Sequence, residues 1–173
     1  MAANFTKTPV PIRNAEERIH DWKEVVLGFS KEETVEEASR CLGCKKPMCV
    51  PVCPAHINIP QFISHLKTQQ YNEAMQIILD EMPLVNICGR VCTHYCEDKC
   101  VKSRRSGGLQ IMELKRAVSS YCNEEDVPIT CLPNTGKKVA VVGSGPAGLA
   151  AAYFLRRKGH KVVVYEQKHK IGG

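Results

Sequence analysis

Cysteine is the feature that most constrains what this chain can fold into. The chain has 173 residues and ten cysteines, eight of which fall in two sets between residues 41 and 100. The sets are Cys41-x2-Cys44-x4-Cys49-x3-Cys53-Pro54 and Cys88-x3-Cys92-x3-Cys96-x3-Cys100. Residues 1–13 are polar and broken by proline, without the apolar segment of a secretory signal. We therefore expect a cytoplasmic protein, in which clustered cysteines bind metals or act in redox chemistry more often than they form disulfides.

The two sets favour iron–sulfur clusters over zinc. Such clusters need several thiolates from a short segment rich in turns, and runs of their ligands often end in Cys-Pro. In two-cluster ferredoxins the last cysteine of a run binds the other cluster, which would tie the two sets together. Zinc stays open, because Cys-x2-Cys is also a zinc half-site and eight thiols could form two sites of four. Cys122 and Cys131 lie outside both sets and are expected to be free and buried, and His94 to be a bystander.

A glycine-rich loop near the end of the sequence predicts a dinucleotide site. The loop Gly143-Ser144-Gly145-Pro146-Ala147-Gly148 matches the pattern Gly-x-Gly-x-x-Gly. Runs of β-branched residues predict strands at 138–142 and 161–166, and a helix is expected between them at 147–158. A strand before the loop and a helix after it are the context that this pattern requires.

Each position of the loop has an expected role. Gly143 would make a tight turn, Gly145 would let a pyrophosphate approach the backbone, and Gly148 would let helix and strand pack closely. The phosphates would face the N-terminus of the helix. Glu166 would accept a hydrogen bond from a ribose hydroxyl and repel a 2′-phosphate, so the site is expected to suit FAD or NAD rather than NADP.

Charge and hydropathy argue against a nucleic-acid or a membrane partner. The net charge of +6 is concentrated in residues 137–173, where several cations fall at the end of the expected helix and suit its dipole. Residues 139–155 carry no charge but contain three glycines and a proline. A strand, a turn and a helix explain that segment better than a membrane span does.

Local signals predict helices between the cysteines and divide the chain into four regions. Ser30 with Glu33 forms a capping box before a helix at 31–40, and Asn14 with Glu17 predicts a shorter helix before it. Further helices are expected from Ile59-Pro60 onward, at 73–80 with Asn72 as the cap, and at 110–121. The predicted regions are an N-terminal helical segment at 1–40, a cysteine-rich domain at 41–130, a linker at 131–136 and an incomplete Rossmann unit at 137–173.

With these motifs together, the chain resembles the start of the glutamate synthase small-subunit family of FAD and iron–sulfur oxidoreductases. The resemblance is carried by residues 36–49, 53–60, 88–92 and 96–101 and by the glycine loop. It extends to the N-terminal region of dihydropyrimidine dehydrogenase. It implies a mainly α fold, with an α-helical ferredoxin-like two-cluster domain followed by a truncated βαβ start of a Rossmann-type FAD-binding domain.

The resemblance also implies the ligands of two [4Fe–4S] clusters. One cluster would be held by Cys41, Cys44, Cys49 and Cys100, and the other by Cys53, Cys92 and Cys96. In relatives the fourth ligand of the second cluster follows a Gly-x-Leu/Ile turn, and Gln110 matches that position in Gly107-Gly-Leu-Gln. Cys88 and Glu113 are the alternatives for this fourth place.

The implied function is electron transfer between a flavin and a partner through the two clusters. NAD(P)H would be the electron donor of the complete protein, and a larger redox subunit such as a glutamate synthase large subunit would be the partner. Two parallel strands and one helix are too few for a flavin domain, so FAD is expected only where that domain is completed. The alternative is a non-catalytic iron–sulfur adaptor with a remnant Rossmann piece.

Overall fold

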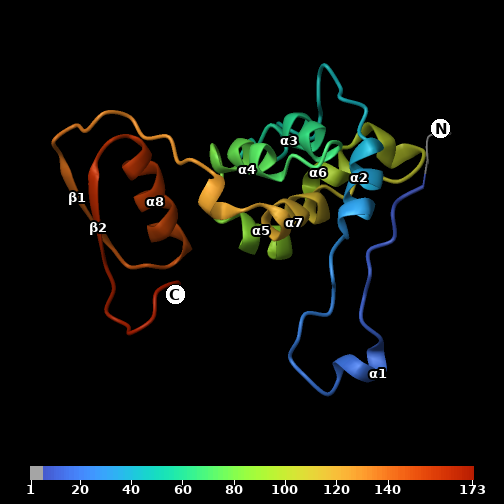
Figure 1. Cartoon of the computed structure of the whole chain (residues 1–173), viewed down its shortest axis with the longest axis horizontal. Helices are drawn as coiled ribbons and strands as arrows, with labels where there is room; N and C mark the ends of the chain where they lie inside the picture. Colours follow the sequence, from blue (N-terminus) through green and yellow to red (C-terminus); the bar gives the residue numbers. More distant parts are fainter. Residues whose placement is uncertain (1–5) are drawn as a thin grey trace. The chain divides into compact units, whose positions relative to one another are not determined.

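The computed structural model describes residues 6–173 and separates into two compact units. The first unit comprises Met1–Glu81 and Val85–Val127, and the second comprises Met82–Leu84 and Pro128–Gly173. The fold is mostly helical, with one small parallel sheet in the second unit (Figure 1). In the described part of the chain, no helix is both long and apolar enough to cross a membrane.

The first unit is built from short helices joined by long loops. They are α1 (Ala15–Arg18), α2 (Lys31–Ser39), α3 (Ile59–Leu66), α4 (Tyr71–Leu79), α5 (Val85–Val91), α6 (Tyr95–Asp98) and α7 (Ile111–Tyr121). Single 3-10 turns lie between α6 and α7 at Val101–Arg104 and after α7 at Glu124–Asp126. Both cysteine sets lie in this unit, in the loops and short helices between α2 and α7.

The core of the first unit forms where α7 packs against α2, α3, α4 and α5. Its fully buried apolar side chains come mainly from α3, α4 and α7, and include Phe62, Ile63, Leu66, Ile78, Leu114 and Val118. Burying a side chain of this size stabilises the fold by about 1.5–3 kcal/mol. The apolar spacing in α3 and α7 therefore fixes which helix faces meet, and the cysteine loops are held at the edge of this core.

Two of the predicted helix starts are found as expected. The capping box of α2 is complete, with the Ser30 hydroxyl accepting from the Glu33 amide and the Glu33 carboxylate accepting from the Ser30 amide. Asn14 caps α1 through the amide of Glu16. These contacts satisfy amide groups that have no partner within the helix itself.

The predicted cap at Asn72 is wrong. Helix α4 begins at Tyr71, its N-cap residue is Gln70, and the Asn72 side chain instead accepts from the Asn123 amide at 2.9 Å. Tyr71 is buried beside Tyr121, with ring centroids 5.3 Å apart. This packing starts the helix before the local capping signal, because buried aromatic area outweighs one exposed cap.

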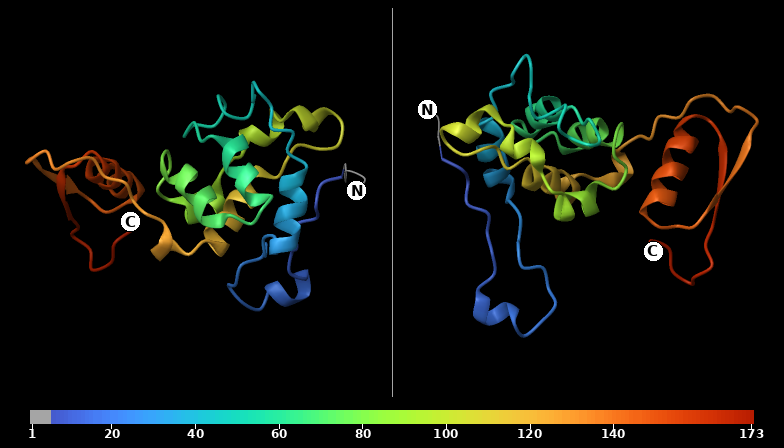
Figure 2. Two further views of the ribbon diagram at one scale, coloured as in Figure 1. Left: turned by 45° about the horizontal axis from the view of Figure 1, so that its top comes forward. Right: turned by 180° about the vertical axis from the view of Figure 1, so that it is seen from behind.

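The described residues before α2 form an arm that extends away from the helices of the first unit (Figures 1 and 2). A single antiparallel bridge between Ile12 and Val26 joins its two sides, and α1 lies near its tip. The arm returns to the helices through Glu24, whose carboxylate pairs with Arg90 and, at 2.9 Å, with Arg116. The base of the arm is thereby held against α5 and α7.

The second unit is a βαβ arrangement. Strand β1 (Lys138–Val142) leads through the glycine loop into α8 (Pro146–Arg157), and β2 (Lys161–Tyr165) returns parallel to β1. Gly159 ends the helix with a φ of +84°, where a Cβ atom would lie 2.1 Å from the carbonyl oxygen of Pro133. The predicted strand–turn–helix–strand order is therefore confirmed, with each element within one residue of its expected bounds.

Candidate iron–sulfur centre and dinucleotide loop

One cavity of the first unit is lined by four cysteines from both sets. Cys41, Cys44, Cys49 and Cys100 surround it, together with apolar side chains that include Ile59 and Ile63 of α3. The first three thiols come from the loop after α2, and Cys100 comes from the segment just after α6. The structure thus brings together the four residues that the resemblance implies for one cluster.

Burial favours the protonated form of two of these thiols, Cys41 and Cys49. Burial first, and then the neighbouring thiols of Cys41, Cys100 and Cys44, raise the pKa of Cys49 to about 11. The pKa of Cys41 is also raised by burial, against the opposing effect of the Gly43 amide that donates to its sulfur. Iron binding must therefore displace protons here, as thiolate coordination generally does.

The second group of cysteines gathers around Cys96. This residue is buried on α6, and its pKa is raised to about 12, first by burial and then by nearby Glu97, Cys53, Cys92 and Cys49. Cys53 and Cys92 are thus its thiol neighbours, and Cys49 links this group to the first. The amide of His94 donates to the Cys92 sulfur at 3.4 Å, an interaction typical of the surroundings of cluster ligands.

The imidazole of His94 contacts the backbone of its own turn. Its Nδ1 atom lies 3.0 Å from the carbonyl oxygen of Cys92, within its own turn. His94 adopts a left-handed backbone conformation with a φ of +44°, and α6 begins directly after it. His94 lies in the turn between Cys92 and Cys96, and its bystander role stays a prediction.

The turn before α7 depends on two glycines. Gly107 has a φ of +76°, and a Cβ atom on Gly108 would lie 2.3 Å from the carbonyl oxygen of Glu97. The turn therefore lies directly against α6, the helix that carries Cys96. This close approach explains why two glycines precede Leu109 and Gln110.

Gln110 is held at the start of α7 by two hydrogen bonds. Its backbone amide donates to Glu37 Oε1 at 2.9 Å, and its side-chain Nε2 donates to the carbonyl oxygen of Thr8 at 2.5 Å. The side-chain nitrogen is thereby engaged, so Oε1 is the atom that a metal would use. Ligation by Gln110 stays a prediction.

The two alternatives for the fourth ligand of the second cluster, Cys88 and Glu113, lie in surroundings that differ from those of Gln110. Cys88 lies half-buried on α5, which packs against α7. Glu113 is buried on α7, and its Oε2 lies 3.8 Å from Nη1 of Arg116. Burial raises the pKa of Glu113, which favours the neutral form, a poorer ligand than a carboxylate.

Sequence reasoning missed the buried ion pair of Glu37 and Arg40. Glu37 is fully buried on α2, and its carboxylate accepts from Arg40 at 2.6 Å, from the Gln110 amide and from the Thr8 amide at 3.0 Å. These bonds join α2, the N-terminal segment and the turn before α7. The spacing of three residues between Glu37 and Arg40 suggests an ion pair on one helix face, but nothing in the sequence marks the pair as buried.

None of the ten cysteines forms a disulfide. Cys122 and Cys131 form no disulfide, and they are half-buried rather than buried as predicted. Among residues 6–173, no group of three or more His, Cys, Asp or Glu side chains is close enough to hold a single metal ion. The four thiols of the first group surround a cavity instead. That placement fits a [4Fe–4S] group, in which the four cysteines bind four different irons.

The glycines of the dinucleotide loop each have a distinct structural reason. Gly143 has a φ of +96°, which favours glycine, and a Cβ atom on Gly148 would lie 2.1 Å from the Gly143 carbonyl oxygen. Gly145 differs, because a Cβ atom there would meet nothing within 4 Å and its φ of −66° suits any residue. The space at Gly145, next to the uncapped N-terminus of α8, therefore fits a bound pyrophosphate.

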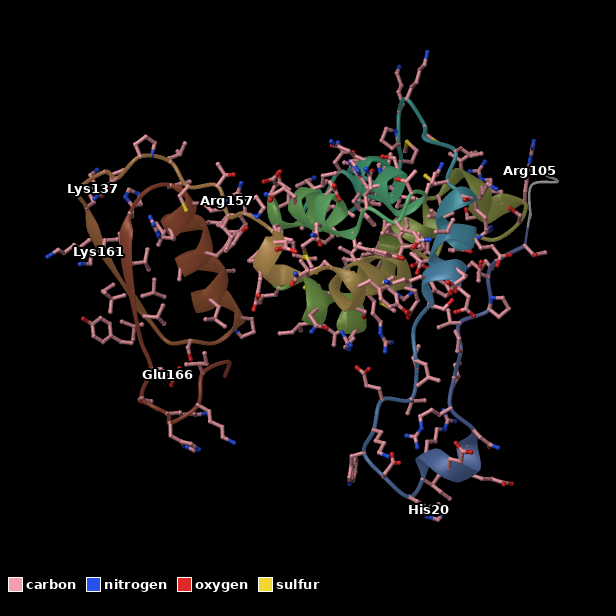
Figure 3. All side chains as sticks on the ribbon, viewed as in Figure 1. His20, Arg105, Lys137, Arg157, Lys161 and Glu166 are labelled. Atoms are coloured by element: carbon pink, nitrogen blue, oxygen red, sulfur yellow. The ribbon has the colours of Figure 1, made fainter. Side chains whose placement is uncertain are left out.

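Glu166 follows β2, at the end of the sheet away from Lys137 and Lys161 (Figure 3). Its carboxylate accepts from the Ser144 hydroxyl at 2.5 Å and from the Ser144 amide at 2.8 Å. These hydrogen bonds, with those from following amides, lower the pKa of Glu166 to about 2. Ser144 is fully buried, so it holds the carboxylate in place beside the loop. Ligand contacts by the loop residues 143–148 and by Glu166 stay predictions.

A family model described as dihydropyrimidine dehydrogenase domain II, 4Fe-4S cluster, matches residues 18–127. The chain belongs to this family. The match contains both cysteine sets and the turn that leads to Gln110. A second model, described as an NAD(P)-binding Rossmann-like domain, matches residues 141–173, which hold the glycine loop and Glu166. The iron–sulfur character of the first unit and the Rossmann-like character of the second are therefore shown.

Curated relatives bear out the resemblance to glutamate synthase small chains. The chain is 38% identical to the NADPH-Fe(3+) oxidoreductase subunit beta of Geobacter sulfurreducens over 91% of its length. It is 34% identical to the glutamate synthase [NADPH] small chains of Mycobacterium tuberculosis and Escherichia coli, over 96% of its length in each case. The chain spans 23%, 34% and 35% of these three relatives respectively.

Proposed function

We infer that this chain is the electron-transfer portion of an NAD(P)H-dependent iron–sulfur flavoprotein. The observation that carries the proposal is the cavity lined by Cys41, Cys44, Cys49 and Cys100 in a member of a 4Fe-4S family. When bound, a flavin and iron–sulfur clusters together allow the two electrons of a hydride to be passed on one at a time. The residues of this chain bind these groups, orient them and exclude water from them.

In this proposal the first unit binds two [4Fe–4S] clusters in an α-helical ferredoxin-like arrangement. Cys41, Cys44, Cys49 and Cys100 hold one cluster. The other takes Cys53, Cys92, Cys96 and Gln110. Cys49 lies close enough to thiols of both groups to affect their electrostatics, which supports neighbouring clusters with a short path for electron transfer. The apolar wall formed by Ile59 and other side chains excludes water from the first site.

The second unit supplies the start of a dinucleotide site. The open space at Gly145 and the N-terminus of α8 support a pyrophosphate there, and ionised Glu166 supports a ribose hydroxyl as its partner. FAD is the proposed nucleotide, since a carboxylate at Glu166 repels a 2′-phosphate. The site requires the further strands of a complete Rossmann domain, so FAD binding should be measured on a protein that contains those strands.

The names of the relatives support the proposed partner. Two of them are small chains of an NADPH-dependent glutamate synthase, and a third is the beta subunit of an NADPH-dependent iron reductase. We propose that the complete protein takes electrons from NAD(P)H and delivers them to a larger redox subunit, such as a glutamate synthase large subunit.

Metal and sulfide analysis of anaerobically purified protein tests the proposal. We expect about eight irons and eight labile sulfides per chain, with a broad visible band that bleaches on reduction. About four irons and four sulfides per chain would contradict the second cluster and support the first alone. Zinc without labile sulfide would contradict the electron-transfer function and leave a structural zinc module.

A further inference from the structure

Arg40 is a buried cation at the wall of the cavity that the four thiols line. It is 3% exposed, it directly precedes Cys41, and it is among the residues that surround the cavity. A charged side chain is rarely buried without a set of specific partners. The partners of each guanidinium nitrogen therefore indicate what this arginine is for.

Two of the three guanidinium nitrogens of Arg40 have protein partners. Nη1 donates to Glu37 at 2.6 Å, and Nη2 donates to the backbone carbonyl oxygens of Ser106 and Gly107, both at 2.9 Å. These bonds fix the planar guanidinium in one orientation. The remaining nitrogen, Nε, is buried and has no hydrogen-bond partner.

An unpaired buried N–H group calls for an acceptor, because its desolvation is otherwise uncompensated. Among the side chains around the cavity, only sulfur atoms can accept a hydrogen bond. The others are apolar, or are the donors Lys99 and Lys102. A sulfur at this site is therefore the side-chain partner available to Nε.

We propose that Arg40 sets the reduction potential of the cluster bound by Cys41, Cys44, Cys49 and Cys100, with its Nε–H group donating a hydrogen bond to a sulfur of that cluster. The proposal rests on the proposed function, which places a [4Fe–4S] group in this cavity. Reduction adds negative charge to the cluster. A buried cation and an N–H···S bond stabilise the reduced form more than the oxidised form, so Arg40 raises the potential.

Redox titration of the reconstituted full chain tests this role. The signal of the first cluster is identified as the one that is lost in a Cys44→Ala/Cys49→Ala variant. Arg40→Gln should lower its midpoint potential enough to change the reduced-to-oxidised ratio at least about tenfold, which is about 59 mV for one electron. Arg40→Lys keeps the charge but lacks Nε, so it should shift the potential in the same direction by less.

Arg116→Gln is the matched control. Arg116 is also buried and donates to a carboxylate and to a backbone carbonyl oxygen, but it does not line the cavity. We expect this variant to keep the wild-type potential of the first cluster. The proposal is overturned if Arg40 variants with full iron and sulfide keep the wild-type potential, or if Arg116→Gln lowers it equally.

A measurement on unmutated protein covers the case in which Arg40 variants do not hold the cluster. Protein labelled with ¹⁵N at the ε position of arginine is reduced and examined by pulsed electron paramagnetic resonance. We expect a ¹⁵N coupling to the first cluster in the unmutated protein and in Arg116→Gln. If the unmutated protein shows no such coupling, the proposed hydrogen bond is refuted. Protein that assembles no cluster at all would instead refute the proposed function, through its iron and sulfide content.

Discussion

Replacing Glu37 with glutamine removes one charge from the centre of the first unit without changing the shape of the side chain. The Glu37 carboxylate is fully buried and accepts three hydrogen bonds, from the Arg40 guanidinium and from the amides of Thr8 and Gln110. A glutamine has one oxygen and one NH2 group. Its nitrogen must therefore face at least one of these donors, and Arg40 is left buried without a counter-charge.

The expected loss of stability follows from that geometry. Removing one partner of a buried ion pair costs about 3–5 kcal/mol, because the other charge stays buried and unpaired. For a unit of this size the melting temperature should fall by about 10 °C or more. Glu32→Gln is the matched control on the same helix, since Glu32 is exposed in its first turn and its loss should cost less than about 1 kcal/mol.

Thermal unfolding of the anaerobic full chain, followed by circular dichroism at one scan rate, measures both variants. The double variant Glu37→Gln/Arg40→Gln should recover part of the stability lost in Glu37→Gln, because no unpaired charge remains. If Glu37→Gln melts within about 2 °C of Glu32→Gln, the buried pair does not stabilise the junction between α2 and α7, and the argument from burial is wrong.

Three further predictions concern other parts of the chain. Gly148→Ala should disrupt the fold of the second unit, whereas Gly145→Ala should leave the fold intact and abolish FAD retention in a complete protein; limited proteolysis and flavin content separate the two. The pKa of Glu166 is lowered in the fold, so its hydrogen bonds should hold above about pH 4.5 and be lost towards pH 2. The NMR chemical shift of the Ser144 amide, which donates to Glu166, should change over the same pH range. Ser30→Ala should destabilise the first unit by about 1 kcal/mol in thermal unfolding, and a larger loss from an exposed serine such as Ser39→Ala would contradict the capping argument.

Elements with strong local signals could be predicted from sequence. The capping box at Ser30, the β-branched strands and the helix that ends near Tyr121 were all found close to their expected bounds. Helices α5 and α6 were not predicted. They are short, and α5 is set by packing, since a Cβ atom on Gly89 would lie 2.9 Å from the Arg116 backbone. Such contacts between distant segments leave no local pattern in the sequence.

The candidate site was predictable in part. Spacing alone indicated a metal centre but left iron–sulfur and zinc open, and only the resemblance grouped Cys100 with the first set. The structure brings those four residues around one cavity. The role of Arg40 was not predicted, because its backbone partners lie 66 and 67 residues away and a charged pair on a helix normally faces solvent.

Iron and labile sulfide content in paired cysteine variants tests the central claim most directly. Cys44→Ala/Cys49→Ala removes two ligands of the first proposed cluster, Cys92→Ala/Cys96→Ala removes two of the second, and Cys131→Ala is the control. We predict about eight irons and sulfides per chain in the control and about four in each double variant. Equal iron in all three proteins, or zinc in place of iron and sulfide, would contradict the assignment of two clusters to these cysteines.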